Sequence, residues 1–149
     1  MNLGFRAGYV ASLFATRLML GRSAGLIINL SSWAARKHIG KVVYGMAKAV
    51  TDKMTADMAV ESDSHGISVI RFHPGVVRTE RVMEHAAHVD LSNSESPRSI
   101  GRVVAALLSR PEWAKGLTGN VCTAAQLAND WAIADVDGYR PIPLSADDA

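Results

Sequence analysis

Residues 25–31 of the chain read GLIINLS, an apolar run framed by a glycine and a serine. A run of this length without polar alternation is typical of a strand buried on both faces, as in parallel sheets. Two further short runs follow, at residues 67–72 (ISVIRF) and 116–123 (GLTGNVCT), and a stretch with helical character precedes each of them. Strands that alternate with helices indicate a parallel sheet with right-handed crossovers. The sequence therefore predicts an α/β fold.

Three segments carry the helical pattern, at residues 2–20, 43–61 and 97–109. The first is apolar on most faces and must be covered on more than one side. The third has Pro97 in its first turn, where a proline is tolerated best. In the second helix an apolar residue recurs at every fourth position, which predicts one apolar stripe, at Met46, Val50, Met54 and Met58.

The order of the segments predicts one partial domain over residues 1–149. Residues 76–97 are the least regular part, and the acidic, proline-bearing tail at 124–149 is expected to wrap over the surface. Three strands are predicted, whereas a complete doubly wound sheet has about six or more. We therefore expect the C-terminal portion of a doubly wound, Rossmann-like domain whose first half is absent.

Composition excludes several classes of function. The 16 Lys and Arg residues against 14 Asp and Glu give a net charge of +2, and the basic residues are scattered, so we expect no nucleic-acid partner and no membrane partner. The apolar stretch at residues 9–20 contains Arg17 and is too short to span a bilayer. Cys122 is the only cysteine, which rules out an intrachain disulfide and favours a reducing compartment, the cytoplasm.

The most informative side chains are those of Tyr44 and Lys48, one turn apart on one face of a predicted helix. An ammonium at this distance stabilises a phenolate by Coulomb attraction and so prepares the tyrosine for acid/base work. Taken alone, the pair also suits a surface tyrosine beside a solvated lysine. Ser32 follows the strand before this helix, at the sheet end where parallel sheets collect reactive groups.

Three stretches in succession resemble motifs of the short-chain dehydrogenase/reductase family. They are INLSS at residues 28–32, YGMAKA at 44–49 and PGVVRT at 74–79, and the tail further resembles one mammalian branch of that family. The resemblance covers nearly the whole chain in the family's order. It implies an NAD(P)-dependent oxidoreductase that transfers hydride between a nicotinamide, NAD or NADP, and a small alcohol or carbonyl substrate.

The resemblance also assigns roles to the residues of the predicted catalytic group. Tyr44 corresponds to the family's general acid/base, and Lys48 to the residue that supports it and contacts the nicotinamide ribose. Ser32 corresponds to the residue that hydrogen-bonds the substrate oxygen, with Ser31 as its competitor. Asn2 corresponds to the helix asparagine of a proton relay, although an asparagine at a helix start is otherwise a cap.

The resemblance also implies cofactor contacts, in the motif at residues 44–49 and in the motif at residues 74–79. Tyr44 and Lys48 are expected to touch the cofactor, as are four residues that follow the second predicted strand, namely Pro74, Gly75, Val77 and Thr79. No glycine-rich phosphate loop is present, so the site for the adenosine half of the cofactor is missing from this chain. Members of the family often pair their two long helices across a two-fold axis, which implies a homo-oligomer built through residues 2–20 and 43–61.

Other readings of the chemistry are weaker. A serine hydrolase needs its nucleophile on a Gly-x-Ser-x-Gly turn, and Ser32 does not lie on one. Residues 84–88, EHAAH, do not follow the zinc-helix order, so we expect no metal site. The serious alternative is a non-catalytic remnant of the family that serves only as an interaction or structural module.

Overall fold

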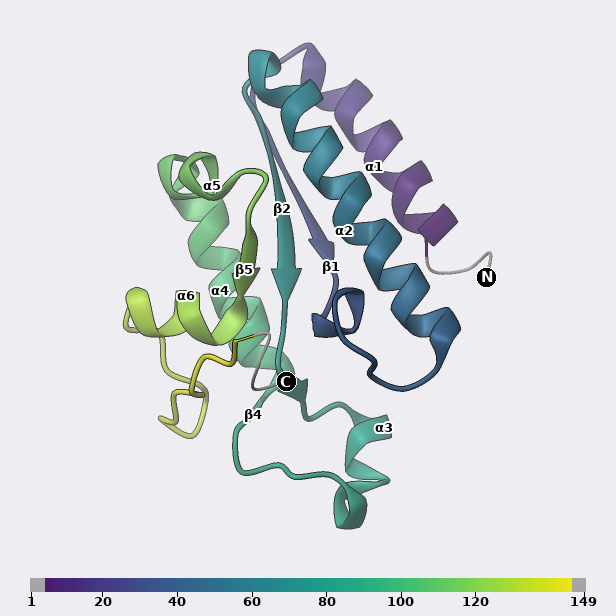
Figure 1. Ribbon diagram of the computed structural model, residues 1–149. Helices are drawn as coiled ribbons and strands as arrows, with labels where there is room; N and C mark the ends of the chain where they lie inside the picture. Colours follow the sequence, from purple (N-terminus) through teal and green to yellow (C-terminus); the bar gives the residue numbers. More distant parts are fainter. Residues whose placement is uncertain (1–4, 146–149) are drawn as a thin grey trace.

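The computed structural model describes residues 5–145 and confirms the α/β architecture (Figure 1). The main sheet has the strand order β1-β2-β5, and both pairings are parallel. Its strands are β1 (Gly25–Leu30), β2 (Ile67–His73) and β5 (Val121–Thr123). β1 and β2 are in register along their length, from Gly25 opposite Ile67 to Leu30 opposite Phe72. All three strands therefore end at the same edge of the sheet.

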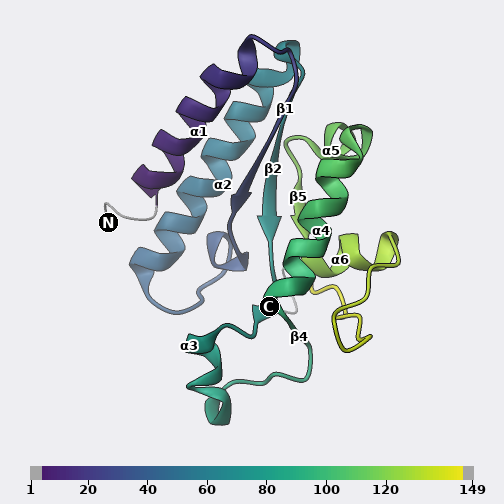
Figure 2. The ribbon, with the colours of Figure 1, turned by 180° about the vertical axis from the view of Figure 1, so that it is seen from behind.

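Helices cover both faces of this sheet, as in a doubly wound fold (Figures 1 and 2). One face carries α1 (Phe5–Leu20) and α2 (Val42–Ser62), which lie side by side. The other face carries α4 (Pro97–Ser109), α5 (Pro111–Leu117) and α6 (Ala124–Asp130). Pro97 and Ser96 start α4 as a first-turn proline and an N-cap whose hydroxyl accepts from Ser99 N.

The central strand β2 joins two apolar clusters, because its successive side chains point to opposite faces. Ile70 and Phe72 are fully buried with Val103 and Leu107 of α4 on one side. Val69 packs on the other side with Ile27 and Ala59. Burial on both faces explains why this strand lacks polar alternation.

A small lobe lies beyond the carboxyl ends of the strands (Figure 1). It contains β3 (Val76–Val77) and β4 (Ser94–Glu95), which pair in parallel, with α3 (Glu80–Met83) and a 3₁₀ turn, η3 (Ala86–His88), between them. Two further 3₁₀ turns lie elsewhere, η1 (Trp33–Ala35) after β1 and η2 (Asp63–His65) after α2. Residues 76–97, which look irregular in sequence, thus contain a pair of strands. Each strand has only two residues, which is too short to leave an alternating pattern in the sequence.

Two predicted boundaries differ from the structure. Of residues 116–123, which were expected to form one strand, only Val121–Thr123 do so, as β5. Residues 116 and 117 end helix α5, and a turn with Gly119 at φ +74° follows. The tail expected to lie on the surface begins with α6, which Thr123 caps by accepting from Gln126 N at 3.2 Å. This helix buries small apolar side chains in the core, at Ala124, Ala125, Leu127 and Ala128.

The apolar stripe of α2 is buried only in part, where Met58 packs against the cluster of Ile27, Val69 and Ala59. Met46 and Val50 are 48% and 41% exposed, whereas the buried positions are polar or small, namely Asp52, Thr55, Ala59 and Ser62. Thr55 accepts from Asn29 Nδ2 of β1 at 3.0 Å, so a polar contact fixes the helix on the sheet. Within residues 5–145, no helix combines the length and the apolarity that crossing a membrane requires.

Candidate active site

Ser32 and Tyr44 meet at the carboxyl end of β1. The Ser32 Oγ and Tyr44 Oη atoms lie 3.2 Å apart, a distance at which either hydroxyl donates to the other. Tyr44 is 45% exposed, so its hydroxyl is open to a ligand. Two hydroxyls that converge in this way at an accessible end of the strands can both hydrogen-bond one oxygen atom of a ligand.

Lys48 lies one turn after Tyr44 on α2 and turns back toward β1. Its Nζ atom donates to Leu30 O at 3.1 Å and lies 5.6 Å from the centre of the Tyr44 ring. The Leu30 carbonyl fixes the ammonium beside the phenol ring. The positive charge therefore stays next to Tyr44.

Ser31 is placed differently from Ser32, although the two are adjacent. Its side chain is buried and its hydroxyl donates to Lys48 O at 3.3 Å, while its backbone N–H donates to Phe72 O at 2.9 Å. Because successive side chains of extended backbone point in opposite directions, Ser31 faces α2 and Ser32 faces the site. Ser32 itself is extended, with φ −166° and ψ 170°.

The approach of α2 to the η1 turn depends on Gly45. A Cβ atom at this position would lie 3.1 Å from Ala34 O, which is tighter than ordinary van der Waals contact. The glycine therefore lets the first turn of α2 settle against the residues that follow Ser32. This contact brings the Tyr44 hydroxyl within reach of Ser32.

The residues of the third motif follow β2 at the same end of the sheet. Trp33, next to Ser32, packs edge-on against His73, next to Pro74, with ring centres 5.1 Å apart. Gly75 is exposed, and its N–H donates to Glu95 Oε2 at 3.1 Å. The two groups of predicted residues thus border one region.

Val77 and Thr79 lie farther along this segment and are half-buried. The Thr79 hydroxyl caps α3 by accepting from Val82 N at 3.4 Å, and a hydroxyl that accepts one bond keeps its own hydrogen for donation. A donor at this position suits a carboxamide or phosphate oxygen. Asn2, the remaining predicted site residue, lies outside the described residues.

A buried pair beneath the site was not expected from the sequence. His73 Nε2 lies 3.1 Å from Asp52 Oδ1, and His73 and Asp52 are 1% and 7% exposed. Burial lowers the pKa of His73, against the opposing effect of its hydrogen bond to Asp52. The only sequence signal was the position of Asp52, one turn beyond Lys48 on the same helix face.

Cys122 offers no nucleophile. It is buried in β5, and burial raises the pKa of its thiol to about 11. Within residues 5–145 we find no group of three or more His, Cys, Asp or Glu side chains arranged to hold a metal ion.

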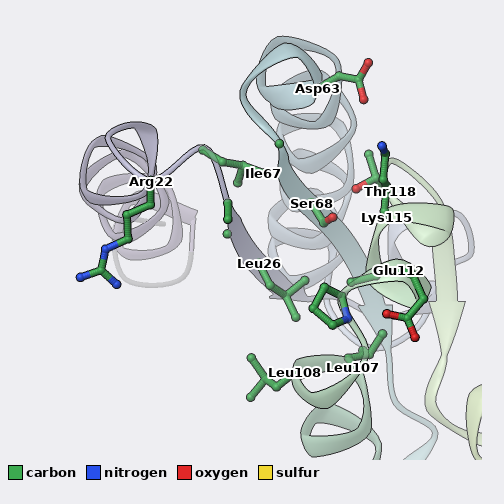
Figure 3. A pocket seen from close by; sticks show the side chains of 15 residues that line it. Arg22, Leu26, Asp63, Ile67, Ser68, Leu107, Leu108, Glu112, Lys115 and Thr118 are labelled. Atoms are coloured by element: carbon green, nitrogen blue, oxygen red, sulfur yellow. The ribbon is translucent and has the colours of Figure 1, made fainter.

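A cavity of about 760 Å³ lies at the opposite end of the strands (Figure 3). Its walls come from the starts of β1 and β2 and from the end of α4 with α5, and Leu26 and Leu107 contribute to its apolar side. None of the predicted site residues that the structure describes line it. Reactive groups of parallel sheets gather at the carboxyl ends of the strands, so this cavity is not the candidate active site.

Comparisons with known proteins identify the family of the chain. Residues 1–90 match the family profile described as short chain dehydrogenase. Dehydrogenase/reductase SDR family member 1 of Mus musculus is 36% identical over 154 residues, which cover 95% of this chain and 49% of the mouse protein. The chain therefore spans about half the length of this relative.

Solved structures give the same result for the fold. A protein described as a short chain dehydrogenase/reductase family protein aligns with a TM-score of 0.69 and 31% identity, over 80% of this chain and 52% of its own. A 4-hydroxyisoleucine dehydrogenase in complex with NADH and succinate aligns with a TM-score of 0.65 and 21% identity, over 82% of this chain and 54% of its own. At that lower identity the likeness concerns the fold alone.

Proposed function

Because the chain belongs to the short-chain dehydrogenase family, we propose that it forms the catalytic part of an NAD(P)-dependent oxidoreductase that interconverts a small alcohol and its carbonyl compound. The observation that carries the proposal is the 3.2 Å contact between Ser32 and Tyr44, with Lys48 beside the tyrosine ring. A general acid/base needs a positioned hydroxyl and a nearby charge that stabilises its ionised form. The site offers both.

In the direction of reduction, the Tyr44 hydroxyl donates its proton to the carbonyl oxygen of the substrate. Ser32 donates a hydrogen bond to the same oxygen and so stabilises the negative charge that develops there. Lys48 stabilises the phenolate left on Tyr44, since its ammonium is held by Leu30 O next to the ring. The nicotinamide, when bound, supplies the hydride for reduction and accepts it for oxidation.

Four residues after β2 are proposed to hold the nicotinamide end of the cofactor, in addition to Tyr44 and Lys48. They are Pro74, Gly75, Val77 and Thr79. Two features favour this assignment, the exposed glycine backbone next to the catalytic group and the free donor of the Thr79 hydroxyl. Membership of the short-chain dehydrogenase family supports a nicotinamide dinucleotide as the ligand, and the choice between NAD and NADP is open.

The chain is proposed to act as one partial domain, residues 1–149, beside a nucleotide-binding half that carries the adenosine site. Within the described sheet, β1 is paired on one side only, with β2. An unpaired edge of this kind accepts a further strand. We propose that strands of the nucleotide-binding half continue the sheet there, and that the part of the tail described after α6, residues 131–145, lies over the surface.

Replacing Tyr44 by phenylalanine tests the proposed chemistry in the complete enzyme, meaning residues 1–149 joined to the nucleotide-binding half. Turnover should fall by a factor on the order of 10²–10⁴, while the affinity for NAD(P)H stays within about twofold, because the hydroxyl acts in proton transfer. Tyr9→Phe is the matched control, since Tyr9 is 47% exposed on α1 and Tyr44 45% exposed on α2.

Two results would contradict the proposal. Near-normal turnover of Tyr44→Phe would remove the residue from the mechanism. A complete protein that folds and binds no nicotinamide cofactor would favour the alternative, a non-catalytic remnant that acts as an interaction or structural module.

We also propose that the chain forms a homo-oligomer through α1 and α2. Both helices expose large apolar side chains, among them Phe14 at 57% and Leu18 at 79% on α1 and Val42 at 68% on α2. Exposed apolar surface of this extent marks interaction sites. The single buried thiol, Cys122, is compatible with the cytoplasm as the place of action.

Sedimentation of the complete enzyme at micromolar concentration tests the interface. Phe14→Glu should shift the protein to the monomer, because a buried unpaired charge is costly. Leu108→Glu is the control, since Leu108 is 63% exposed on α4, away from the proposed interface. A wild-type protein that sediments as a strict monomer would refute the assignment.

A further inference from the structure

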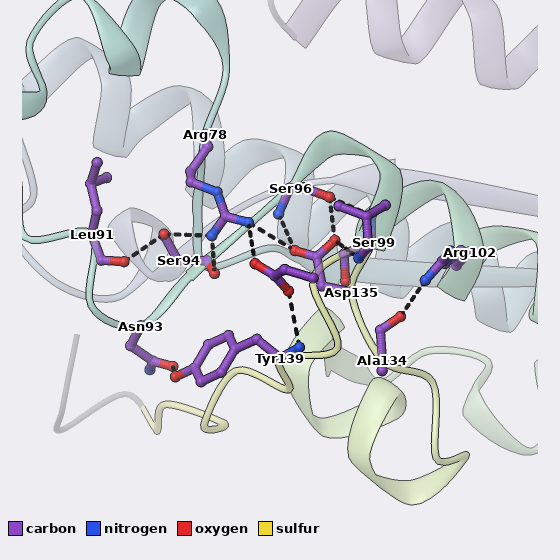
Figure 4. A network of polar contacts seen from close by, with 12 residues as sticks. Arg78, Leu91, Asn93, Ser94, Ser96, Ser99, Arg102, Ala134, Asp135 and Tyr139 are labelled. Carbon is purple, nitrogen blue, oxygen red and sulfur yellow. Dashed lines mark hydrogen bonds and ion pairs between the residues drawn. The ribbon is translucent and has the colours of Figure 1, made fainter.

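A buried carboxylate in the tail joins three segments of the chain that are distant in sequence. Asp135 lies beyond α6, and its side chain is fully buried. Its Oδ2 atom accepts from Arg78 at 3.0 Å and from Ser96 N at 2.8 Å, and its Oδ1 atom accepts from Val136 N at 2.6 Å and from the Ser96 hydroxyl (Figure 4). The carboxylate therefore has donors on both oxygens.

These contacts keep the carboxylate ionised. Burial opposes ionisation of Asp135, but the hydrogen bonds from Ser96 and Val136 and the Arg78 charge outweigh it and lower its pKa. A buried ion pair whose members are also hydrogen-bonded is costly to break, because removal of one partner leaves an uncompensated charge. Arg78 and Asp135 are therefore expected to stay together at neutral pH.

Arg78 lies between Val77 and Thr79, which are proposed cofactor contacts. Its guanidinium also donates from Nη1 to Ser94 O at 2.8 Å and Ser94 Oγ at 2.9 Å. Its backbone N–H donates to Glu95 O at 2.8 Å. The side chain and backbone of one residue thus tie this segment to β4.

The other end of the cofactor segment is tied to the same strand. Gly75 N donates to the buried carboxylate of Glu95, and Val76 and Val77 pair with Ser94 and Glu95. Residues 75–78 are therefore held at both ends by Ser94 and Glu95. Asp135 in turn holds residues 94–96 through Ser96.

Strands of two residues are too short to keep their own register, so an outside anchor matters here. We propose that Asp135 is a positioning residue for cofactor binding, which acts by holding Arg78 and Ser96 and thereby the backbone of residues 75–79. The inference rests on the proposed function of that segment and deepens it. The tail thus controls the affinity for the nicotinamide end of the cofactor without touching the reacting atoms.

Asp135→Asn tests this role in the complete enzyme, because the change removes the charge and keeps the volume. The dissociation constant for NADH or NADPH, measured by fluorescence titration, should rise roughly tenfold, since a buried charge-assisted hydrogen bond contributes on that order. Turnover at saturating cofactor should stay within about threefold. Asp137→Asn is the matched control, because Asp137 lies 3.5 Å from the same Arg78 nitrogen but is 52% exposed.

Hydrogen exchange of the cofactor-free enzyme gives a readout that does not depend on activity. In Asp135→Asn, amides of residues 75–79 and 94–96 should exchange faster, while those of β1 and β2 keep the wild-type rate. If Asp135→Asn fails to fold, Arg78→Gln breaks the same ion pair from its more exposed partner and carries the same expectations. If both variants fold, the double variant should raise the dissociation constant little more than either change alone.

A lower melting temperature with unchanged cofactor affinity and unchanged exchange at residues 75–79 would overturn the inference and leave Asp135 a structural anchor of the tail. If the wild-type enzyme binds neither NADH nor NADPH, the proposed function fails. The exchange comparison still decides in that case whether Asp135 controls residues 75–79.

Discussion

Adjacent serines that point in opposite directions offer a sharp test of the site. Ser32 Oγ lies 3.2 Å from Tyr44 Oη, whereas Ser31 is buried and donates to Lys48 O at 3.3 Å. Ser32→Ala should lower kcat/KM of the complete enzyme by a factor on the order of 10²–10³, or about 3–4 kcal/mol of transition-state stabilisation, the usual cost of losing one donor to a developing oxyanion. The free energy of unfolding should change by less than about 0.5 kcal/mol, because Ser32 is not buried in the core.

Ser31→Ala should show the reverse pattern. The change removes one long hydrogen bond from a buried position, so the free energy of unfolding should fall by about 0.5–1.5 kcal/mol. Its kcat/KM should stay within about twofold of wild type, because its hydroxyl faces α2.

Steady-state rates at saturating cofactor and urea unfolding curves, measured on both variants, decide between the two patterns. A catalytic loss for Ser31→Ala that equals or exceeds the loss for Ser32→Ala would refute the reasoning. It would mean that the bound state presents the other serine to the substrate.

Two further predictions concern stability. Gly66 adopts φ +67°, and an added Cβ would lie 2.3 Å from Ser23 O, so Gly66→Ala should destabilise the fold by about 2 kcal/mol or more in urea unfolding. Gly40→Ala, at φ +71° with open space around it, should cost only about 1 kcal/mol, and equal losses would contradict the steric argument. Burial lowers the pKa of His73, so the unfolded state takes up a proton first as the pH falls below about 6.5. The free energy of unfolding should therefore decrease from that pH down to the folded-state pKa of His73. His73→Gln should flatten this pH dependence, whereas the exposed control His65→Gln should leave it unchanged. A pH dependence that persists in His73→Gln would assign it to another group.

Local patterns in the sequence were sufficient to predict the main helices and strands. The apolar runs at residues 25–31 and 67–72 became β1 and β2, because a strand covered on both faces needs apolar side chains at successive positions. Pro97 predicted the start of α4, because a first-turn proline acts within a few residues. The spacing of Tyr44 and Lys48 likewise depends only on helix geometry. Their catalytic roles stay predictions.

Contacts between distant segments decided the rest. Asp52 of α2 is buried because its carboxylate contacts His73, 21 positions away in the sequence, whereas Met46 of the apolar stripe is exposed. The tail begins with α6, whose alanines are buried in the core, and the ion pair of Arg78 and Asp135, which are 57 positions apart, joins the β3–β4 lobe to the tail. Burial of a polar group is favourable only when a partner satisfies it, and that partner comes from a part of the chain that no local pattern includes. The sequence by itself determined the long helices and the long strands, and the tertiary structure determined the short elements and which faces and charges are buried.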